Sequence, residues 1–347
     1  MKKSRKYILG TAAVVALFSI LIGCSSSSSR DVAFVASGNR IDVKIGGDIV
    51  TTYVFGDERS KPSFVPVRSA SGIELTRRYP LTELEGGSDD EPHHVGIYFA
   101  ADQVNGSKFW NNTSVSPQIK HVSTDSMKGG KGSGTLKTTA EWINESGQVL
   151  LIEKKSVTFI AGKNDSEYEI DFDVELIADE DVVHFEDIEE GVLAFRWSDY
   201  LREAEGGNYP QPGKPLPEES VKGTGMYFSS NGDERAENIW GKRARWVALQ
   251  GVRNQKVVGA AMLNHPDSIN YPTFWHVRAY GLMSGNPLGQ GDFLRQNPYQ
   301  KNPVLWLRKT LHENEKIHFR FKIIVFEGLK TQEQIESKFQ EFVKSDK

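Results

Sequence analysis

Three stretches of the sequence combine residue types that can carry acid–base or binding chemistry. The first covers residues 92–99, where His93 and His94 follow the acidic run 89–91. If this stretch is a strand, adjacent side chains point to opposite faces, so the two histidines cannot share a metal ion. His94 is therefore the candidate catalytic residue, and His93 is equally well explained as a buried structural histidine. Acids before a proline are more typical of a solvated loop, so no metal site is predicted.

The second stretch covers residues 264–281 and begins with Asn264 and His265. Read as a strand, its later part places His276, Arg278 and Tyr280 on one face. Imidazole titrates near neutral pH, guanidinium binds anions bidentately, and a phenol donates a hydrogen bond. The trio predicts a site for a polar or anionic substrate. The alternative is a polar strand face with one hydrogen-bonded histidine.

The third stretch covers residues 240–246, where alternation places Lys242 on the same face as Trp246. Tryptophan beside cations is common in sugar sites, because an indole stacks on the apolar face of a sugar ring. The same pattern is equally common on an amphipathic surface strand. This signal is weak by itself.

Composition and absent motifs exclude several classes of function. There is no glycine-rich phosphate loop, no His-Glu-x-x-His and no Gly-x-Ser-x-Gly in the 347 residues. A formal net charge of −4 argues against nucleic acid as a partner. The single cysteine excludes a disulfide scaffold and a cysteine-based zinc site. No cofactor is predicted.

The N-terminus resembles a bacterial lipoprotein signal. A basic start is followed by an apolar run over residues 7–22, too short for a confident membrane span, and then by Cys24. We predict a signal peptide over residues 1–23, acylation of Cys24, and a serine-rich tether over residues 24–30. The body would then lie in the periplasm or at the cell surface. Ser25, where an aspartate would favour inner-membrane retention, favours the outer membrane.

Hydrophobic alternation predicts antiparallel β-structure for most of the body. Period-two patterns cover residues 40–45, 48–55, 135–144, 149–160, 168–176 and 316–327, joined by short turns. The acids of 168–176 are expected on a solvated face. Two helices are expected, a weak one around 198–205 and a C-terminal one after a capping box of Thr331 and Gln334. Residues 207–217 form a proline-rich loop or lid. We predict an all-β protein, with one large antiparallel β-sandwich domain over residues 31–347.

Several blocks together resemble the PmoA-like family of bacterial proteins. They are residues 61–67, 72–80, 92–110, 240–246 and 265–281. The family commonly has histidine where this chain has Glu91, and a basic residue where it has Val95. The family label implies a methane oxygenase component, which the sequence does not support. A membrane oxygenase subunit needs several long apolar spans, and a copper site on an N-terminal histidine is excluded if the mature chain begins at Cys24.

The long hairpins and the ending 311–328 also resemble the galactose-mutarotase-like β-supersandwich. That resemblance implies a concave sheet lining a sugar cleft, in which histidine and a carboxylate do acid–base chemistry. It is a resemblance of fold, and a fold does not determine function.

Two functions from different classes stay open, and the first is favoured. One is an envelope-anchored enzyme acting on an oligosaccharide, including uronic acids, as a lyase, epimerase or hydrolase. Proton transfer would fall to His94 or His276 with Tyr280, and anion binding to Arg278 with Arg77 or Arg78. Sugar positioning would fall to Lys242, Trp246, Asn264 and His265.

A hydrolase would also need two facing carboxylates, for which Glu91, Glu315 and Glu327 are candidates. The alternative is a non-catalytic glycan-binding lipoprotein that serves a polysaccharide-utilisation system.

Overall fold

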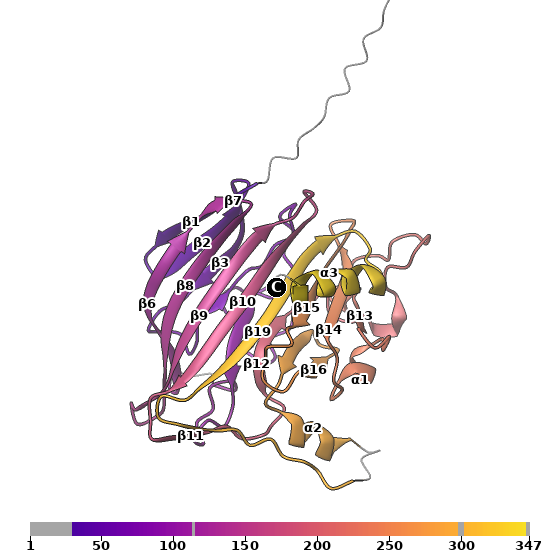
Figure 1. Ribbon diagram of the computed structural model, residues 1–347. Helices are drawn as coiled ribbons and strands as arrows, with labels where there is room; N and C mark the ends of the chain where they lie inside the picture. The colour runs from indigo at the N-terminus through magenta and orange to yellow at the C-terminus, as the bar shows by residue number, and fades with distance from the viewer. Residues whose placement is uncertain (1–29, 113–114, 298–301, 345–347) are drawn as a thin grey trace, which may run out of the picture.

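Two large antiparallel sheets pack against one shared hydrophobic core in this computed structural model (Figure 1). The structure describes residues 30–112, 115–297 and 302–344. Cys24, the predicted signal peptide and the tether up to residue 29 lie outside the described residues. The all-β antiparallel sandwich with a short C-terminal helix is confirmed.

The first sheet has nine strands. In spatial order they are β16 (Phe274–Arg278), β17 (Leu282–Asn286), β12 (Gly191–Arg196), β5 (Ile97–Ala101), β4 (Ser63–Phe64), β3 (Asp48–Val54), β2 (Arg40–Ile45), β1 (Asp31–Ser37) and β7 (Gly130–Lys131).

The second sheet has eight strands. In spatial order they are β13 (Met226–Ser229), β14 (Trp246–Arg253), β15 (Lys256–Asn264), β19 (Lys316–Glu327), β10 (Glu167–Ala178), β9 (Val149–Ala161), β8 (Ser133–Ile143) and β6 (Gln118–Lys128). A small third sheet pairs β11 (Val182–His184) with β18 (Thr310–His312).

The predicted strands form, and the acidic face of β10 has partners that the alternation alone did not reveal. β10 pairs with β19 in a register that sets its acids beside basic residues. Glu175 accepts a 2.6 Å bond from Lys316, and Glu169 one of 2.8 Å from Lys322. Opposite charges on neighbouring strands stabilise a sheet. This face is therefore a ladder of ion pairs and not only a solvated surface.

Helix α3 (Gln332–Lys344) covers the outer face of the second sheet. Its predicted capping box forms, since Thr331 N donates to Gln334 Oε1 at 2.9 Å and Gln334 N donates to Thr331 Oγ1 at 3.3 Å. Ile335, Phe339 and Phe342 pack on side chains of β14, β15 and β19. These strands are thus buried on both faces, which explains the continuous apolar run at the end of β19.

The predicted helix at 198–205 is wrong. The backbone there bonds to distant segments, with Ser198 N donating to Leu75 O at 2.8 Å and Ala204 N donating to Gly225 O at 2.8 Å. Only a short 3-10 turn forms, at Glu205–Gly207, and the proline-rich stretch after it is irregular, as expected. The sequence analysis does not predict helices α1 (Ala236–Ile239) and α2 (Gln290–Gln296). They are too short for a helical period to be recognised in the sequence.

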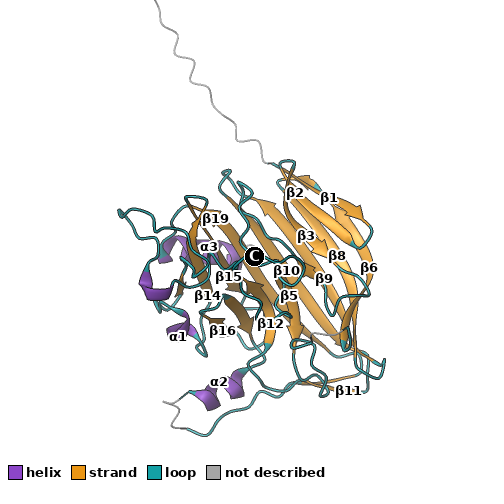
Figure 2. Ribbon diagram, turned by 180° about the vertical axis from the view of Figure 1, so that it is seen from behind, coloured by secondary structure: helices purple, strands orange, loops and turns teal. Residues whose placement is uncertain are grey.

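The helices all lie towards the β13–β16 end of the molecule, away from β1 and β6 (Figure 2). Within the part of the chain that the structure describes, no helix has both the length and the apolar character needed to cross a membrane.

Phe339 tests the packing of α3 on the sheet. Phe339→Ala should lower the free energy of unfolding by about 3–5 kcal/mol, because it empties a fully buried site. Denaturant unfolding followed by circular dichroism measures this. Glu341→Ala, at an exposed position of the same helix, should change it by less than about 0.5 kcal/mol. Equal effects of both substitutions would mean that α3 is not docked.

Candidate functional site

A pocket of about 230 Å³ lies beside the β16 end of the nine-stranded sheet. All its lining side chains can form hydrogen bonds, and none is aliphatic. They are Glu91, His93, His94, Trp110, Asn111, Glu189, Glu190, His276, Arg278 and Tyr280. The structure therefore brings together the four residues that were predicted as catalytic, His94, His276, Arg278 and Tyr280, from parts of the chain about 180 residues apart.

Strand alternation on β16 positions one wall of the pocket. Trp275 and Val277 point into the hydrophobic core, while His276 and Arg278 face the pocket. Tyr280 follows in the turn that leads to β17. This is the arrangement that the period-two pattern predicts for a strand with one buried face.

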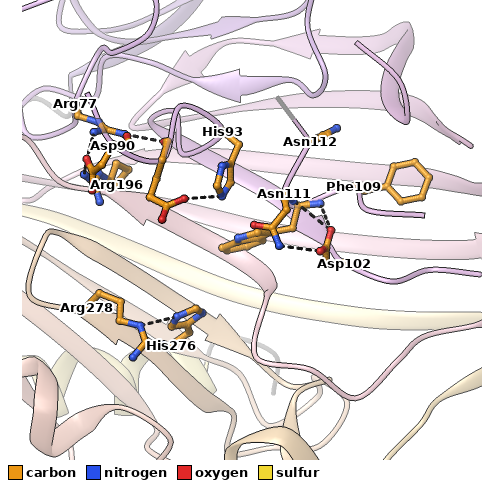
Figure 3. Close-up of polar contacts among 12 residues, drawn as sticks. Arg77, Asp90, His93, Asp102, Phe109, Asn111, Asn112, Arg196, His276 and Arg278 are labelled. Atoms are coloured by element: carbon orange, nitrogen blue, oxygen red, sulfur yellow. Dashed lines mark hydrogen bonds and ion pairs between the residues drawn. The ribbon is translucent and has the colours of Figure 1, made fainter. Parts of the chain in front are cut away.

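Both ring nitrogens of His276 are engaged in hydrogen bonds, of which Figure 3 shows the one with Arg278. Arg278 Nε can only donate, so His276 Nε2 accepts from it, at 3.0 Å. His276 Nδ1 therefore carries the proton and donates to the carbonyl oxygen of Glu189 at 3.1 Å. Burial, with the nearby Arg278 charge, lowers the pKa of His276 to about 3. His276 thus holds Arg278 in place as a neutral imidazole.

Arg278 is also held by the carboxylate of Glu189. Its Nη2 donates to the two carboxylate oxygens at 3.1 and 3.0 Å. Trp240 supports the pair, because its Nε1 donates to Glu189 Oε2 at 3.1 Å and its ring lies 5.1 Å from the guanidinium. Arg278 Nη1 makes no hydrogen bond within the described residues, so it can receive an anionic group of a ligand.

A tight turn places His93 and His94 on the same side of the chain. Glu91 has a left-handed backbone (φ 43°), and His94 N donates to Glu91 O at 3.0 Å. The two imidazole rings lie 4.1 Å apart. The expectation that they point to opposite faces is wrong, because it required a strand and β5 begins only at Ile97. Gly96 lets the chain pass from this turn into β5, since a β-carbon at this position would clash with the carbonyl oxygen of Phe64.

His94 lies between two tyrosine rings at the bottom of the turn. It stacks on Tyr98 at 6.0 Å and on Tyr280 at 6.3 Å, with Trp110 edge-on at 5.7 Å. Neither of its ring nitrogens has a hydrogen-bond partner within the described residues. Burial, together with neighbouring positive charges, lowers the pKa of His94 well below its usual value. The ring is therefore neutral at physiological pH.

Two arginines fix this turn by sharing the carboxylate of Asp90 (Figure 3). Arg77 Nη1 lies 2.7 Å and Arg196 Nη2 lies 2.8 Å from Asp90 Oδ1. Arg77 Nη2 also donates to the carbonyl oxygens of Asp90 and Glu91, at 2.8 and 2.9 Å. Arg77, which was predicted to bind substrate, does not line this pocket: its buried side chain holds the turn and lines a separate cleft of about 260 Å³.

Sequence reasoning missed four residues of the pocket, Trp110, Asn111, Glu189 and Glu190, and Glu190 has the most unusual chemistry. Burial raises its pKa from the usual 4.5 to about 7, and the nearby acids Glu189, Asp102 and Asp292 add to the shift. A carboxyl group that titrates near neutral pH can both donate and accept a proton in catalysis. Its only sequence signal is a pair of adjacent acids before a buried strand, a pattern that solvated loops share.

Asp102 holds a further wall of the pocket. It accepts hydrogen bonds from Trp110 N at 3.0 Å, Asn111 N at 3.2 Å and Asn111 Nδ2 at 2.8 Å (Figure 3). The loop that carries Trp110 and Asn111 is therefore tied to the end of β5, next to Glu190, whose carbonyl oxygen accepts from Asp102 N at 3.2 Å.

The predicted sugar-positioning residues lie outside this pocket, which corrects that part of the prediction. Trp246 is completely buried beneath α3 and donates to Glu336 Oε2 at 2.8 Å, so its ring cannot stack on a ligand. Lys242 pairs with Asp233 at 2.7 Å on the surface. Both were assigned from alternation alone, which cannot tell which element covers a face.

Three more predicted residues are likewise placed elsewhere. Asn264 is buried and accepts from Thr273 N at 3.1 Å, and His265 Nδ1 accepts from Asp267 N at 3.2 Å. Arg78 donates from Nε to Glu74 at 2.9 Å and lines a separate cleft of about 260 Å³. Of the carboxylates proposed to pair, Glu91 alone lines the pocket, since Glu327 bonds Ser69 at 2.7 Å and Glu315 bonds His312 N at 3.0 Å.

Residues 40–340 match a family model described as a family of unknown function, DUF6807. This chain belongs to the DUF6807 family. The whole pocket lies inside the matched residues, so it is part of the DUF6807 domain. The resemblance to the PmoA-like family stays a prediction. No curated protein sequence matches the chain.

Among solved structures, this DUF6807 chain is similar to a galactose mutarotase related enzyme from Lactobacillus acidophilus. The TM-score is 0.29 at 9% identity, covering 86% of this chain and 98% of that one. It is also similar to the GH36 α-galactosidase AgaA from Geobacillus stearothermophilus in complex with stachyose, with a TM-score of 0.31 and 13% identity, covering 86% of this chain and 40% of that one. At these TM-scores neither likeness carries an argument about function.

The raised pKa of Glu190 predicts a pH-dependent effect of Glu190→Gln on stability. The folded-state pKa of about 7 lies above the usual 4.5, so the wild type loses stability as pH rises between these values. Glutamine carries no charge at any pH. The variant should therefore melt a few degrees higher than wild type at pH 8 and at nearly the same temperature at pH 4.

Thermal unfolding at the two pH values measures this difference. The control is Glu341→Gln, at an exposed position of α3. It should change the melting temperature by the same small amount at pH 4 and at pH 8. If the difference in melting temperature between Glu190→Gln and wild type is no larger at pH 8 than at pH 4, the pKa of Glu190 is not raised.

Proposed function

We propose that this protein acts on a carbohydrate by general acid–base chemistry, with Glu190 as the group that transfers the proton. The observation that carries the proposal is a carboxyl group with a pKa of about 7 in the same pocket as Arg278 and Tyr280. Groups with such shifted pKa values concentrate at catalytic sites, because proton transfer is most effective when the pKa lies near the working pH.

The chemical character of the pocket supports a hydroxyl-rich ligand. Every side chain that lines it offers a hydrogen-bonding group, an aromatic ring or both. Tyr280 is half-buried and lines the pocket beside these polar groups, with Arg196 4.6 Å from the centre of its ring. A volume of about 230 Å³ is below the roughly 300–1,000 Å³ of sites that enclose drug-sized ligands. One sugar unit of an oligosaccharide would enter, and the rest would lie outside.

Each of the remaining groups has a role that its contacts support. Arg278 would bind a carboxylate, as in a uronic acid, or negative charge that develops during the reaction. Burial raises the pKa of Tyr280 to about 12, so its phenol stays protonated and would donate a hydrogen bond to the sugar. His276 would keep Arg278 in position.

A non-catalytic glycan-binding protein is the alternative function. The same hydrogen-bonding groups could hold a sugar without changing it. Binding of this kind needs no group that titrates near neutral pH, so Glu190 separates the two functions.

The test is to incubate full-length protein, purified in mild detergent, with a panel of neutral and uronic-acid oligosaccharides. Mass spectrometry detects elimination or hydrolysis, and proton NMR detects epimerisation, which leaves the mass unchanged. We expect turnover of at least one sugar. Glu190→Gln should lower the rate about 100-fold or more, the usual contribution of general acid–base catalysis, with sugar binding retained.

Glu341→Gln is the matched control and should keep full activity. Sugar binding without any turnover by wild type would establish the glycan-binding alternative. Turnover that Glu190→Gln leaves within a few-fold of wild type would remove Glu190 from the mechanism.

We further propose that the protein is a lipoprotein of the cell envelope, most of its body outside the cytoplasm. The proposal rests on the basic start, the apolar run and the lone Cys24. Replacing Cys24 with serine removes the thiol that would be acylated. Cys24→Ser should therefore abolish incorporation of a labelled fatty acid and leave the signal peptide uncleaved, which mass spectrometry of the purified chain detects. Equal labelling of the variant and the wild type would rule out Cys24 as the anchor.

A further inference from the structure

Glu91, His93 and His94 bring three metal-ligand side chains to one point of the pocket wall. One ligand atom from each lies within 4.8 Å of the others. From this arrangement we propose that the three residues bind a divalent transition-metal ion of the zinc type, with its remaining coordination positions open to the pocket. The inference rests on the geometry of the turn and does not depend on a sugar being the ligand.

The backbone of the turn makes the cluster possible. Adjacent side chains on a regular strand point to opposite faces and cannot reach one point, but this segment is not a strand. The left-handed Glu91 and the hydrogen bond from His94 N to Glu91 O close a tight turn. His93 Nε2 consequently lies 3.5 Å from Glu91 Oε2. Carboxylate and imidazole already face each other before any ion is bound.

Both histidines have ring nitrogens that lack a partner. His93 Nδ1 and both nitrogens of His94 are buried and make no hydrogen bond within the described residues. The two residues are 8% and 2% exposed. Leaving a buried polar group unsatisfied is unfavourable, so such groups in folded proteins call for an explanation. A metal ion bound by the imidazoles accounts for part of this, because it takes the lone pair of one ring nitrogen of His94, neither of which has a partner within the described residues.

The turn is held rigidly enough to act as a binding site. Arg77 donates to the backbone carbonyls of Asp90 and Glu91, and Arg77 and Arg196 both bond Asp90. Two arginines on one carboxylate leave positive charge beside the site. The carboxylate of Glu91 balances that charge, which makes it the ligand on which cation binding depends most.

The donor set indicates the class of metal. Two imidazoles and one carboxylate match the protein ligands of catalytic zinc sites, in which a fourth position stays open. In a tetrahedral site, zinc–nitrogen bonds of about 2.0–2.1 Å place two ligand atoms about 3.4 Å apart. The three ligand atoms now lie within 4.8 Å of one another, so side-chain movements of about 1 Å each would complete the site. Other first-row divalent ions suit the same ligands, and Zn²⁺ serves as the probe because it binds more tightly than most of them.

The experiment is titration of Zn²⁺ into full-length protein that has been dialysed against a chelator. Isothermal titration calorimetry gives stoichiometry and affinity, and elemental analysis after gel filtration counts the bound metal. We expect one Zn²⁺ per chain. His93→Ala and His94→Ala should each weaken binding by more than the roughly 10–100-fold that loss of an outer-shell partner costs.

Glu91→Gln is the decisive variant, because its side chain is partly exposed and the change should leave the fold intact. It should weaken Zn²⁺ binding strongly while its thermal unfolding without metal matches wild type. His312→Ala, at an exposed histidine away from the pocket, is the control and should bind Zn²⁺ as wild type does.

Absence of stoichiometric binding, or binding that Glu91→Gln and His94→Ala leave unchanged, would overturn the metal site. Either result leaves the proposed function of Glu190 standing, since that function is tested with sugars and without added metal. Loss of sugar turnover in Glu190→Gln with normal Zn²⁺ binding would likewise separate the two proposals.

Discussion

The buried guanidinium groups of Arg77 and Arg196 both form ion pairs with the carboxylate of Asp90. The shape of the pocket wall depends on these two ion pairs. Removing a charged group from water is unfavourable by several kcal/mol unless an opposite charge and hydrogen bonds replace the water. Arg196 ends β12 and Arg77 precedes it in the chain by more than a hundred residues. Because both need Asp90, they hold the turn of Glu91, His93 and His94 against the sheet.

Burial also determines the charge states around the pocket. It lowers the pKa of His93 to about 4 and that of His276 to about 3, and it raises that of Glu190 to about 7. In each case a low-dielectric surrounding disfavours the charged form of the group. The histidines are therefore neutral near pH 7, while Glu190 exchanges its proton there. The ion pair of Arg278 with Glu189 is supported by Trp240 and His276.

The second sheet packs on both of its faces at one side of the molecule. β14, β15 and β19 pack on the main core with one face and on α3 with the other. Trp246 belongs to the α3 side, although its sequence neighbours suggested a ligand-binding surface. An aromatic ring beside cations can serve either purpose, and the element that covers it decides which.

Local sequence patterns determined the strands, because side-chain direction alternates along a strand whatever the strand packs against. The period-two pattern predicted β2 and β19 with their observed ends, and the capping box predicted the start of α3. The same alternation placed His276 and Arg278 together on one face. Cys24 and the segment before it are interpreted from sequence alone, as they lie outside the described residues.

Only the tertiary structure decided which side chains from distant segments lie together in the pocket. The turn at Glu91 brings His93 and His94 together, and its left-handed backbone is stabilised by Arg77 and Arg196 from elsewhere in the chain. Glu190 has an unusual pKa because folding buries it and brings Asp102 and Asp292 close to it and to its neighbour Glu189. A strand pattern reports which face is buried, and burial by itself does not say which side chains from other strands share that face. Long-range packing supplies that information, and with it the pocket.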